Sequence, residues 1–267
     1  MRLHDCFERL EHAAFIPFFT VGDPDLDTTR ALVKEAAARG ADIVELGVPF
    51  SDPIADGPTI QASYGRALEK GFKLDCLFEL VRRLRADGVT TPLVAMISQS
   101  LVFKRGPDRF LKEAAGAGID GLIVPDLPAG YEGDTVERAA AAGLDLIFLC
   151  APTTTPERRA RIVERSTGFI YCIAVAGITG TRATLPTDLE ANVRDLKRRT
   201  DKPICVGFGI SKPEQAAAVA SFADGAIVGS ALVKRVAELG AQGLPPVKLV
   251  RVVGEELAAL ADAVHGA

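Results

Sequence analysis

Residues 43–58 read IVELGVPFSDPIADGP, and this stretch indicates how the chain folds. It begins as a short apolar strand in which Glu45 is the only charged residue, and a loop with three prolines, two aspartates and a glycine follows. The apolar residues on both sides of Glu45 predict a strand that is buried on both faces, as in a parallel sheet. A carboxylate in such a strand is costly unless it has a partner or a chemical use.

Glu45 and Asp56 allow two interpretations. Asp56 lies in the loop that the prolines stiffen, so the two acids occupy different environments, and such pairs suit acid–base chemistry because their pKa values differ. Alternatively, Glu45 pairs with a core Arg or Lys, and Asp56 caps the helix that starts near Thr59. Structural ion pairs also perturb acids, so this stretch alone leaves both interpretations open.

One local pattern recurs along the chain. An alanine-rich amphipathic segment ends in glycine, and an apolar strand follows at once. A helix closed by a glycine in the left-handed region, followed by a tight turn into a buried strand, has this sequence. The pattern occurs as AAARGADIVEL (36–46), AAGAGIDGLIVPDL (114–127), AAAAGLDLIFLC (139–150) and, in a variant form, ASFADGAIVGS (220–230).

Buried strands that alternate with helices predict a parallel sheet with right-handed crossovers. Eight strands are expected, at residues 15–21, 43–48, 92–97, 121–127, 145–150, 169–175, 203–208 and 225–229. Eight such units in 267 residues favour an α/β fold, a single (β/α)8 TIM barrel over residues 1–267. We also expect an extra N-terminal helix near residues 3–11 and two helices, 59–70 and 74–86, after the second strand.

The composition excludes several classes of protein. A net charge of −4 provides no basic surface for nucleic acid. The apolar runs have only the length of strands, so no transmembrane helix is expected, and the acidic N-terminus does not resemble a signal peptide. Five cysteines without metal-ligand spacing indicate reduced thiols in a cytoplasmic protein.

Histidine chemistry and nucleotide binding are not expected. His4, His12 and His265 lie near the termini, away from all eight loops, so neither histidine catalysis nor a histidine metal site is predicted. The chain has no P-loop and no strand-to-helix GxGxxG pattern, which argues against ATP or a dinucleotide.

The loops after the strands hold the unusual residues, at the end of the barrel where active sites lie. Residues 207–211 (GFGIS) and Gly229-Ser230 predict a phosphate site, since glycines let backbone N–H groups approach an anion; ordinary turn glycines are the alternative. Residues 176–186 have the composition of a mobile lid with hinges at Gly177 and Gly180, or of a long surface connection.

Three aromatic residues, Phe18, Tyr171 and Phe208, fall near the C-terminal halves of strands. They line a flat apolar pocket near the barrel axis or, alternatively, belong to the core. The residues alone therefore predict a barrel lyase, isomerase or aldolase that acts on a phosphate ester through two carboxylates and without a cofactor.

The chain resembles the tryptophan synthase α subunit family along nearly its whole length. The motifs are FIPFFTVGDPD (15–25), ADIVELGVPFSDPIADGPTIQ (41–61), DGLIVPDLP (120–128), GITGTR (177–182), GFGIS (207–211) and IVGSALVK (227–234). The resemblance implies retro-aldol cleavage of indole-3-glycerol phosphate to indole and glyceraldehyde 3-phosphate in tryptophan biosynthesis. It also implies no cofactor in this chain, because pyridoxal phosphate belongs to a β-subunit partner in an αββα complex.

The same resemblance implies roles for individual residues. Glu45 matches the acid–base carboxylate, and Asp56 matches the carboxylate that engages the indole N–H. Residues that match positions around the indole are Phe18, Leu149, Tyr171, Thr179 and Phe208. Those that match the phosphate site are Gly180, Gly209, Gly229 and Ser230.

The sequence departs from the family at two loops that the resemblance assigns to partner contact and lid closure. Residues 97–101 replace a loop that usually carries Tyr and Asn, and residues 174–176 replace a segment that usually carries Ser. These changes suggest an alternative, a stand-alone lyase that releases free indole. A third interpretation is a non-catalytic activator of a β subunit, against which the retained Glu45 and Asp56 argue.

Overall fold

Nine parallel strands form a nearly closed barrel in the computed structural model, which describes residues 3–54, 56–174, 188–207 and 209–267. The strands are β1 (Ala14–Thr20), β2 (Val44–Gly47), β3 (Leu93–Met96), β4 (Gly121–Ile123), β5 (Asp145–Ile147), β6 (Leu149–Cys150), β7 (Ile170–Ile173), β8 (Ile204–Gly207) and β9 (Gly225–Val228). The order β5-β4-β3-β2-β1-β9-β8-β7-β6 begins and ends with strands that only Phe148 separates in the chain. The Phe148 carbonyl accepts a hydrogen bond from the Tyr171 N–H at 3.1 Å, so the residue between the two end strands is bonded to β7.

The prediction of a TIM barrel is confirmed, with two corrections to the strands. The predicted strand 145–150 is interrupted at Phe148, because β5 pairs with β4 whereas β6 pairs with β7. The predicted strand 121–127 ends at Ile123, since the next residues turn: the Leu127 N–H donates to the Val124 carbonyl at 3.0 Å.

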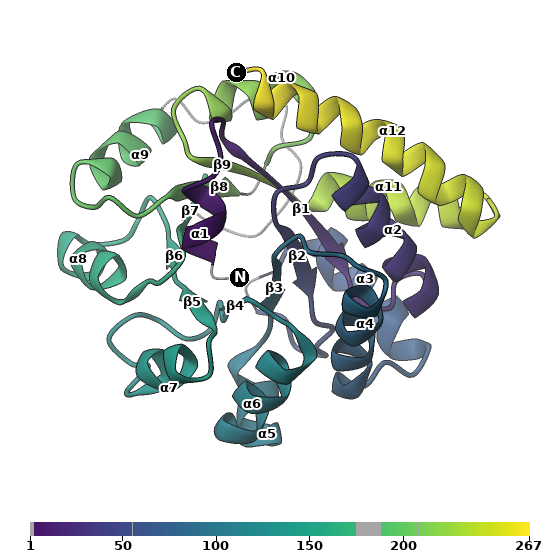
Figure 1. Cartoon of the computed structure of the whole chain (residues 1–267), viewed down its shortest axis with the longest axis horizontal. Helices are drawn as coiled ribbons and strands as arrows, with labels where there is room; N and C mark the ends of the chain where they lie inside the picture. Colours follow the sequence, from purple (N-terminus) through teal and green to yellow (C-terminus); the bar gives the residue numbers. More distant parts are fainter. Residues whose placement is uncertain (1–2, 55, 175–187, 208) are drawn as a thin grey trace.

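Helices surround the strands as an outer ring (Figure 1). Both helices predicted after β2 are present, as α3 (Pro58–Glu69) and α4 (Leu74–Ala86). The others of the ring are α2 (Leu26–Ala38), α5 (Gln99–Arg105), α6 (Pro107–Ala117), α7 (Thr135–Ala141), α8 (Pro156–Arg165), α9 (Leu189–Lys197), α10 (Pro213–Ala220), α11 (Ser230–Ala241) and α12 (Pro246–His265).

The barrel has two apolar layers, which β1 illustrates. Phe15 and Phe19 of β1 belong to a cluster between the strands and the outer helices, whereas Ile16 and Phe18 belong to a second cluster inside the barrel. This alternation follows from the strand period of two residues. Side chains of the inner cluster therefore reach the barrel axis, where a site can be built.

The extra N-terminal helix, α1 (Leu3–Phe7), covers one end of the barrel and appears at its centre in Figure 1. Leu3 is fully buried, and its N–H donates to the Asp145 carboxylate at 2.9 Å. Asp145 begins β5, so α1 covers the N-terminal ends of the strands. The opposite, C-terminal ends carry the loops in which the sequence predicts the site.

The structure also describes the cysteines and the lengths of the helices. All five cysteines are free, and Cys76 is the one that is only half-buried. Among the described residues, no helix is both long and apolar enough to span a bilayer.

Candidate active site

Glu45 lies inside the barrel on β2, in register with Phe18 of β1 and Val94 of β3. Its side chain is 1% exposed, and neither carboxylate oxygen has a hydrogen-bond partner in the part of the chain that the structure describes. Among the described residues, Glu45 therefore has no Arg or Lys as an ion-pair partner. A buried carboxyl without a partner is a feature that stability alone does not explain.

Burial, with a smaller contribution from the charge of Asp56, raises the pKa of Glu45 to about 8. The ionised form is disfavoured because burial removes the charge from the bulk water that would stabilise it. At neutral pH the side chain is therefore mostly a neutral carboxylic acid, which can donate a proton.

Asp56 lies in the loop between β2 and α3. Its N–H donates to the Pro53 carbonyl at 3.2 Å, and its own carbonyl accepts from Gln61 Nε2 at 2.7 Å, so the backbone of this residue is held on both sides. Helix α3 starts at Pro58 with Gly57 as its N-cap and without a side-chain cap. The interpretation of Asp56 as a helix cap is therefore wrong.

Burial, followed by the charge of Asp126, raises the pKa of Asp56 to about 6. Asp56 is thus mostly ionised at neutral pH, whereas Glu45 is mostly protonated. Two carboxyl groups whose pKa values are separated in this way can act as an acid and as an electrostatic stabiliser in one reaction.

Both carboxyl groups face one hollow at the C-terminal ends of the strands. It encloses about 420 Å³ of space between atoms, including the solvent at its mouth. Seven of the predicted site residues line it, namely Phe18, Glu45, Asp56, Tyr171, Gly209, Gly229 and Ser230. Ile60, Met96, Ile210 and Ile227 complete the wall. Of these four, only Ile210 belongs to a segment for which the sequence predicts a site role, residues 207–211.

Two glycines make space for the aromatic rings of this hollow. A Cβ atom on Gly47 would lie 2.1 Å from Cζ of Phe18, and one on Gly207 would lie 2.2 Å from the Tyr171 hydroxyl. Any larger residue would displace these rings. Gly207 was predicted as part of the phosphate loop, but its missing side chain accommodates Tyr171.

The N-terminus of α11 lies at the same hollow. Its N-cap, Gly229, offers no side-chain cap, so the first N–H groups of the helix are available together with the positive end of its dipole. Gly209 adopts φ +93°, and a Cβ atom there would meet no described residue within 4 Å, so its backbone borders space that the described part of the chain leaves open. This arrangement can bind an anion.

The remaining predicted site residues differ in position. Leu149 is half-buried on β6, packs against the inner cluster and does not line the hollow. Thr179, Gly180 and Phe208 lie outside the described residues, as does the predicted lid at 176–186.

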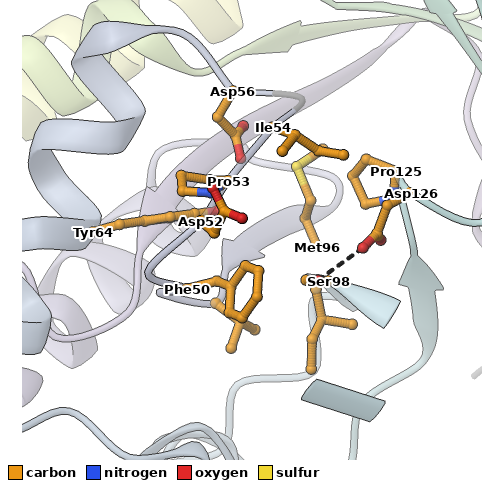
Figure 2. A pocket seen from close by; sticks show the side chains of 12 residues that line it. Phe50, Asp52, Pro53, Ile54, Asp56, Tyr64, Met96, Ser98, Pro125 and Asp126 are labelled. Carbon is orange, nitrogen blue, oxygen red and sulfur yellow. Dashed lines mark hydrogen bonds between the residues drawn. The ribbon is translucent and has the colours of Figure 1, made fainter. Parts of the chain in front are cut away.

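A second hollow adjoins the first and shares Asp56 and Met96 with it (Figure 2). On its far side, Asp126 accepts hydrogen bonds from the Ser98 hydroxyl and the Gln99 N–H, both at 2.8 Å. Ser98 is also the N-cap of α5, so the departure at 97–101 forms an ordered helix start. Asp126 follows a strand end in the VPDLP segment, which could have marked it as a site residue.

Comparisons with known proteins agree with this geometry. The model of the family described as tryptophan synthase alpha chain matches residues 6–261. A tryptophan synthase alpha chain of Rhodopirellula baltica is 48% identical over 255 residues, which cover 92% of each chain. A second, from Acidiphilium cryptum, is 44% identical and covers 99% of this chain and 98% of its own.

Solved structures also match over most of the chain. The tryptophan synthase alpha subunit of Legionella pneumophila superposes with a TM-score of 0.91 at 34% identity, and the match covers 100% of this chain and 99% of that one. A chain from the tryptophan synthase a2b2 complex of Pyrococcus furiosus gives a TM-score of 0.85 at 38% identity, with 93% and 98% covered. From these matches, this chain belongs to the tryptophan synthase alpha chain family.

Proposed function

We propose that this chain cleaves indole-3-glycerol phosphate to indole and glyceraldehyde 3-phosphate, in the retro-aldol step of tryptophan biosynthesis. The observation that carries the proposal is the buried Glu45 carboxyl, which has no hydrogen-bond partner among the residues that the structure describes and faces a hollow that it shares with Asp56. Family membership indicates the reaction, and the hollow supplies the groups that the reaction needs.

The substrate has a flat apolar end and an anionic end, and the hollow has matching sides. The indole ring would lie against Phe18 and Tyr171, which border the hollow from β1 and β7. The phosphate would accept hydrogen bonds from the first N–H groups of α11 and from the Ser230 hydroxyl, close to the open backbone of Gly209. The scissile bond would then lie near Glu45.

Protonation of indole C3 makes the ring an electron acceptor, so that the bond from C3 to the glycerol carbon can break. Protonated Glu45 supplies this proton. Ionised Asp56 accepts a hydrogen bond from the ring N–H and so stabilises the positive charge that develops on the ring nitrogen. Glu45, now a carboxylate, takes the proton of the neighbouring hydroxyl as the aldehyde forms. The proton count balances, and Glu45 returns to its starting form.

These steps use only groups of this chain, and pyridoxal phosphate would be bound by a β-subunit partner. We propose such a partner because similar chains occur in the a2b2 complex of Pyrococcus furiosus. Ile54 borders the second hollow and is 75% exposed. Phe103 lies on α5 and is 64% exposed. Both side chains are suited to apolar contact with another protein.

A stand-alone lyase is the second candidate. The bonds that Ser98 and Gln99 donate to Asp126 hold the start of α5 from within the chain, so this loop does not depend on a partner for its order. Titration of the pure chain with its own β subunit separates the candidates. No change in indole production during the titration would support the stand-alone lyase.

Indole release from indole-3-glycerol phosphate by the purified chain, with and without a β subunit, tests the activity itself. Glu45→Gln and Asp56→Asn should each abolish release, and Asp52→Asn, an exposed aspartate of the same loop, is the matched control and should retain it. Absence of release under both conditions, with the wild-type chain folded, would refute the proposal.

A further inference from the structure

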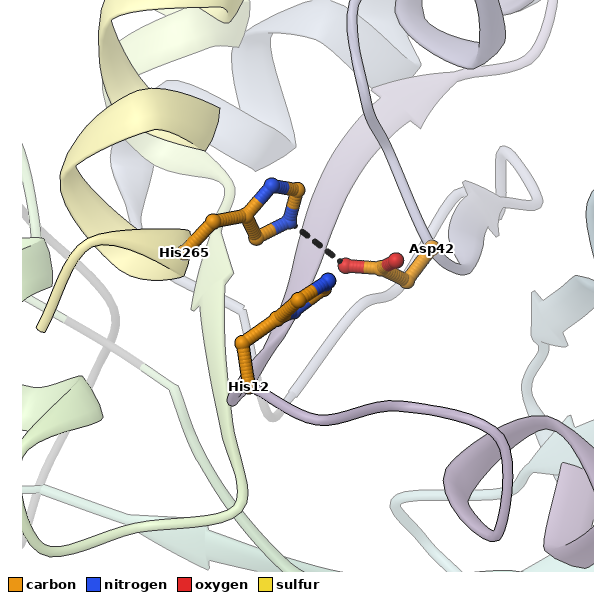
Figure 3. A group of neighbouring side chains, drawn as sticks. All are labelled: His12, Asp42 and His265. Carbon is orange, nitrogen blue, oxygen red and sulfur yellow. Dashed lines mark hydrogen bonds and ion pairs between the residues drawn. The ribbon is translucent and has the colours of Figure 1, made fainter.

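The three residues His12, Asp42 and His265 lie together at the end of the barrel opposite the hollow (Figure 3). His12 precedes β1, Asp42 precedes β2, and His265 is the last residue of α12. No pattern in the sequence predicts this cluster, and Asp42 and His265 are 223 positions apart in the chain. The fold brings the two rings to a centroid distance of 3.9 Å.

Hydrogen bonds to the backbone hold His12 and Asp42, and His265 is bonded to Asp42. Nδ1 of His12 lies 3.1 Å from the Ala13 carbonyl, which can only accept, so Nδ1 carries the proton and Nε2 of the neutral ring keeps a lone pair. The Asp42 carboxylate accepts from the Phe15 N–H at 2.8 Å and lies 2.9 Å from Nε2 of His265. The contacts with the Ala13 carbonyl and the Phe15 N–H are of the outer kind that holds metal-binding imidazoles and carboxylates in proteins. The bond between Asp42 and His265 joins two of the side chains directly, so a bound ion would replace the proton that they share.

We propose that His12, Asp42 and His265 bind a divalent transition-metal ion, with Zn²⁺ as the best match. Two imidazoles and one carboxylate are a known type of three-ligand zinc set that leaves a fourth position for water. The ligand atoms lie within 4.8 Å of one another, whereas tetrahedral zinc holds them about 3.3 Å apart. Rotation of the half-buried imidazoles closes the difference, because neither ring is enclosed by the core.

The charges around the cluster also favour a cation. His265 ends a helix of 20 residues, and the C-terminal end of a helix carries partial negative charge. Asp42 adds a carboxylate, and its side chain is only 12% exposed. A bound ion would therefore face negative groups from two separate elements.

The position of the cluster indicates what the metal does. The ligands come from the segments before β1 and β2 and from α12, so the ion would connect the C-terminal helix to the N-terminal ends of two strands. This end of a TIM barrel contributes to stability, whereas chemistry takes place at the other. The metal would thus stabilise the folded chain without contacting the substrate.

Thermal unfolding of the full chain, treated with a chelator and then titrated with Zn²⁺, tests the proposal. All variants carry Cys76→Ser, which removes the half-buried thiol as a competing ligand. At free Zn²⁺ of about a hundred times the Kd, the Tm should rise by roughly 5 °C. His12→Gln and His265→Gln should lose this rise, and His4→Gln, an exposed histidine outside the cluster, should keep it.

The absence of a rise with Zn²⁺, or an equal rise in all variants, would overturn the proposal. Should the cluster variants fail to fold, the spectrum of Co²⁺ bound to the Cys76→Ser chain replaces the comparison. Absorption bands typical of Co²⁺ coordinated by nitrogen and oxygen atoms support the site. A thiolate charge-transfer band, or the spectrum of the free aqueous ion, overturns it.

Discussion

Replacement of Glu45 by Gln should abolish cleavage and, at the same time, stabilise the fold increasingly as the pH rises above about 5. The carboxyl is buried without a hydrogen-bond partner among the described residues, and its pKa rises from the ordinary 4.5 to about 8. Between these two values, the unfolded chain has released the proton and the folded chain still holds it. The free energy of unfolding therefore falls as pH rises through this window and levels off above it.

The size of the effect follows from the same shift. A gap from 4.5 to about 8, at about 1.4 kcal/mol per pKa unit, corresponds to roughly 5 kcal/mol when complete. Most of this, about 3 kcal/mol, develops between about pH 5 and pH 8. Gln has nearly the shape of the protonated acid and does not titrate, so Glu45→Gln should match the wild type at the acidic end and exceed it at the alkaline end.

Urea unfolding of both proteins across this pH range measures the difference. Glu132→Gln is the matched control, because Glu132 is also buried but receives a hydrogen bond from Arg165. Burial raises the pKa of Glu132, but hydrogen bonds from the backbone and from Arg165 outweigh this effect and hold the pKa below its usual value. Its stabilising contribution is present above the unfolded pKa, so Glu132→Gln should destabilise at neutral pH. A wild-type to Glu45→Gln difference that does not change with pH would refute the reasoning.

Three further substitutions have defined outcomes. Gly209→Val should raise KM about tenfold, because φ +93° costs a branched residue about 1–2 kcal/mol and the side chain would enter the open space; an unchanged KM speaks against a phosphate site there. Gly47→Ala should lower the free energy of unfolding by about 1–3 kcal/mol in urea and raise KM, since its Cβ would lie 2.1 Å from Phe18; wild-type values would show that the ring is free to move. Asp126→Asn should lower the pKa of Asp56, seen as a downward shift of the acidic limb of kcat/KM; an unmoved limb would exclude the charge of Asp126 as a cause.

The sequence predicted the barrel because its signals are local. Glycine after an alanine-rich helix and an apolar run after the glycine repeat along the chain, and each strand found in the structure coincides with a predicted one. The break at Phe148 was not predictable, since it arises from pairing with two different neighbours, β4 and β7. The apolar run in the predicted strand 145–150 is continuous in the sequence, so it does not show where the strand changes its pairing partner.

Some residues of the candidate site were also predictable from the sequence, and others were not. Glu45 stands out in the sequence because a charge in an apolar strand is unusual, and the described residues provide no ion-pair partner that would explain it. Asp126 was missed because its effect on Asp56 acts across a hollow between two loops. The cluster of His12 and His265 was missed for a related reason, since only the closed barrel brings the two ends of the chain together.

The pH dependence of kcat/KM for indole release tests most directly the claim that protonated Glu45 and ionised Asp56 act together. The account predicts a bell-shaped profile that rises through about 6 and falls through about 8, as apparent values of the coupled pair. Above the upper value Glu45 loses the proton that it must donate, and below the lower value Asp56 loses its charge. A profile that is flat between about pH 5 and pH 9, with chemistry limiting the rate, would contradict the account.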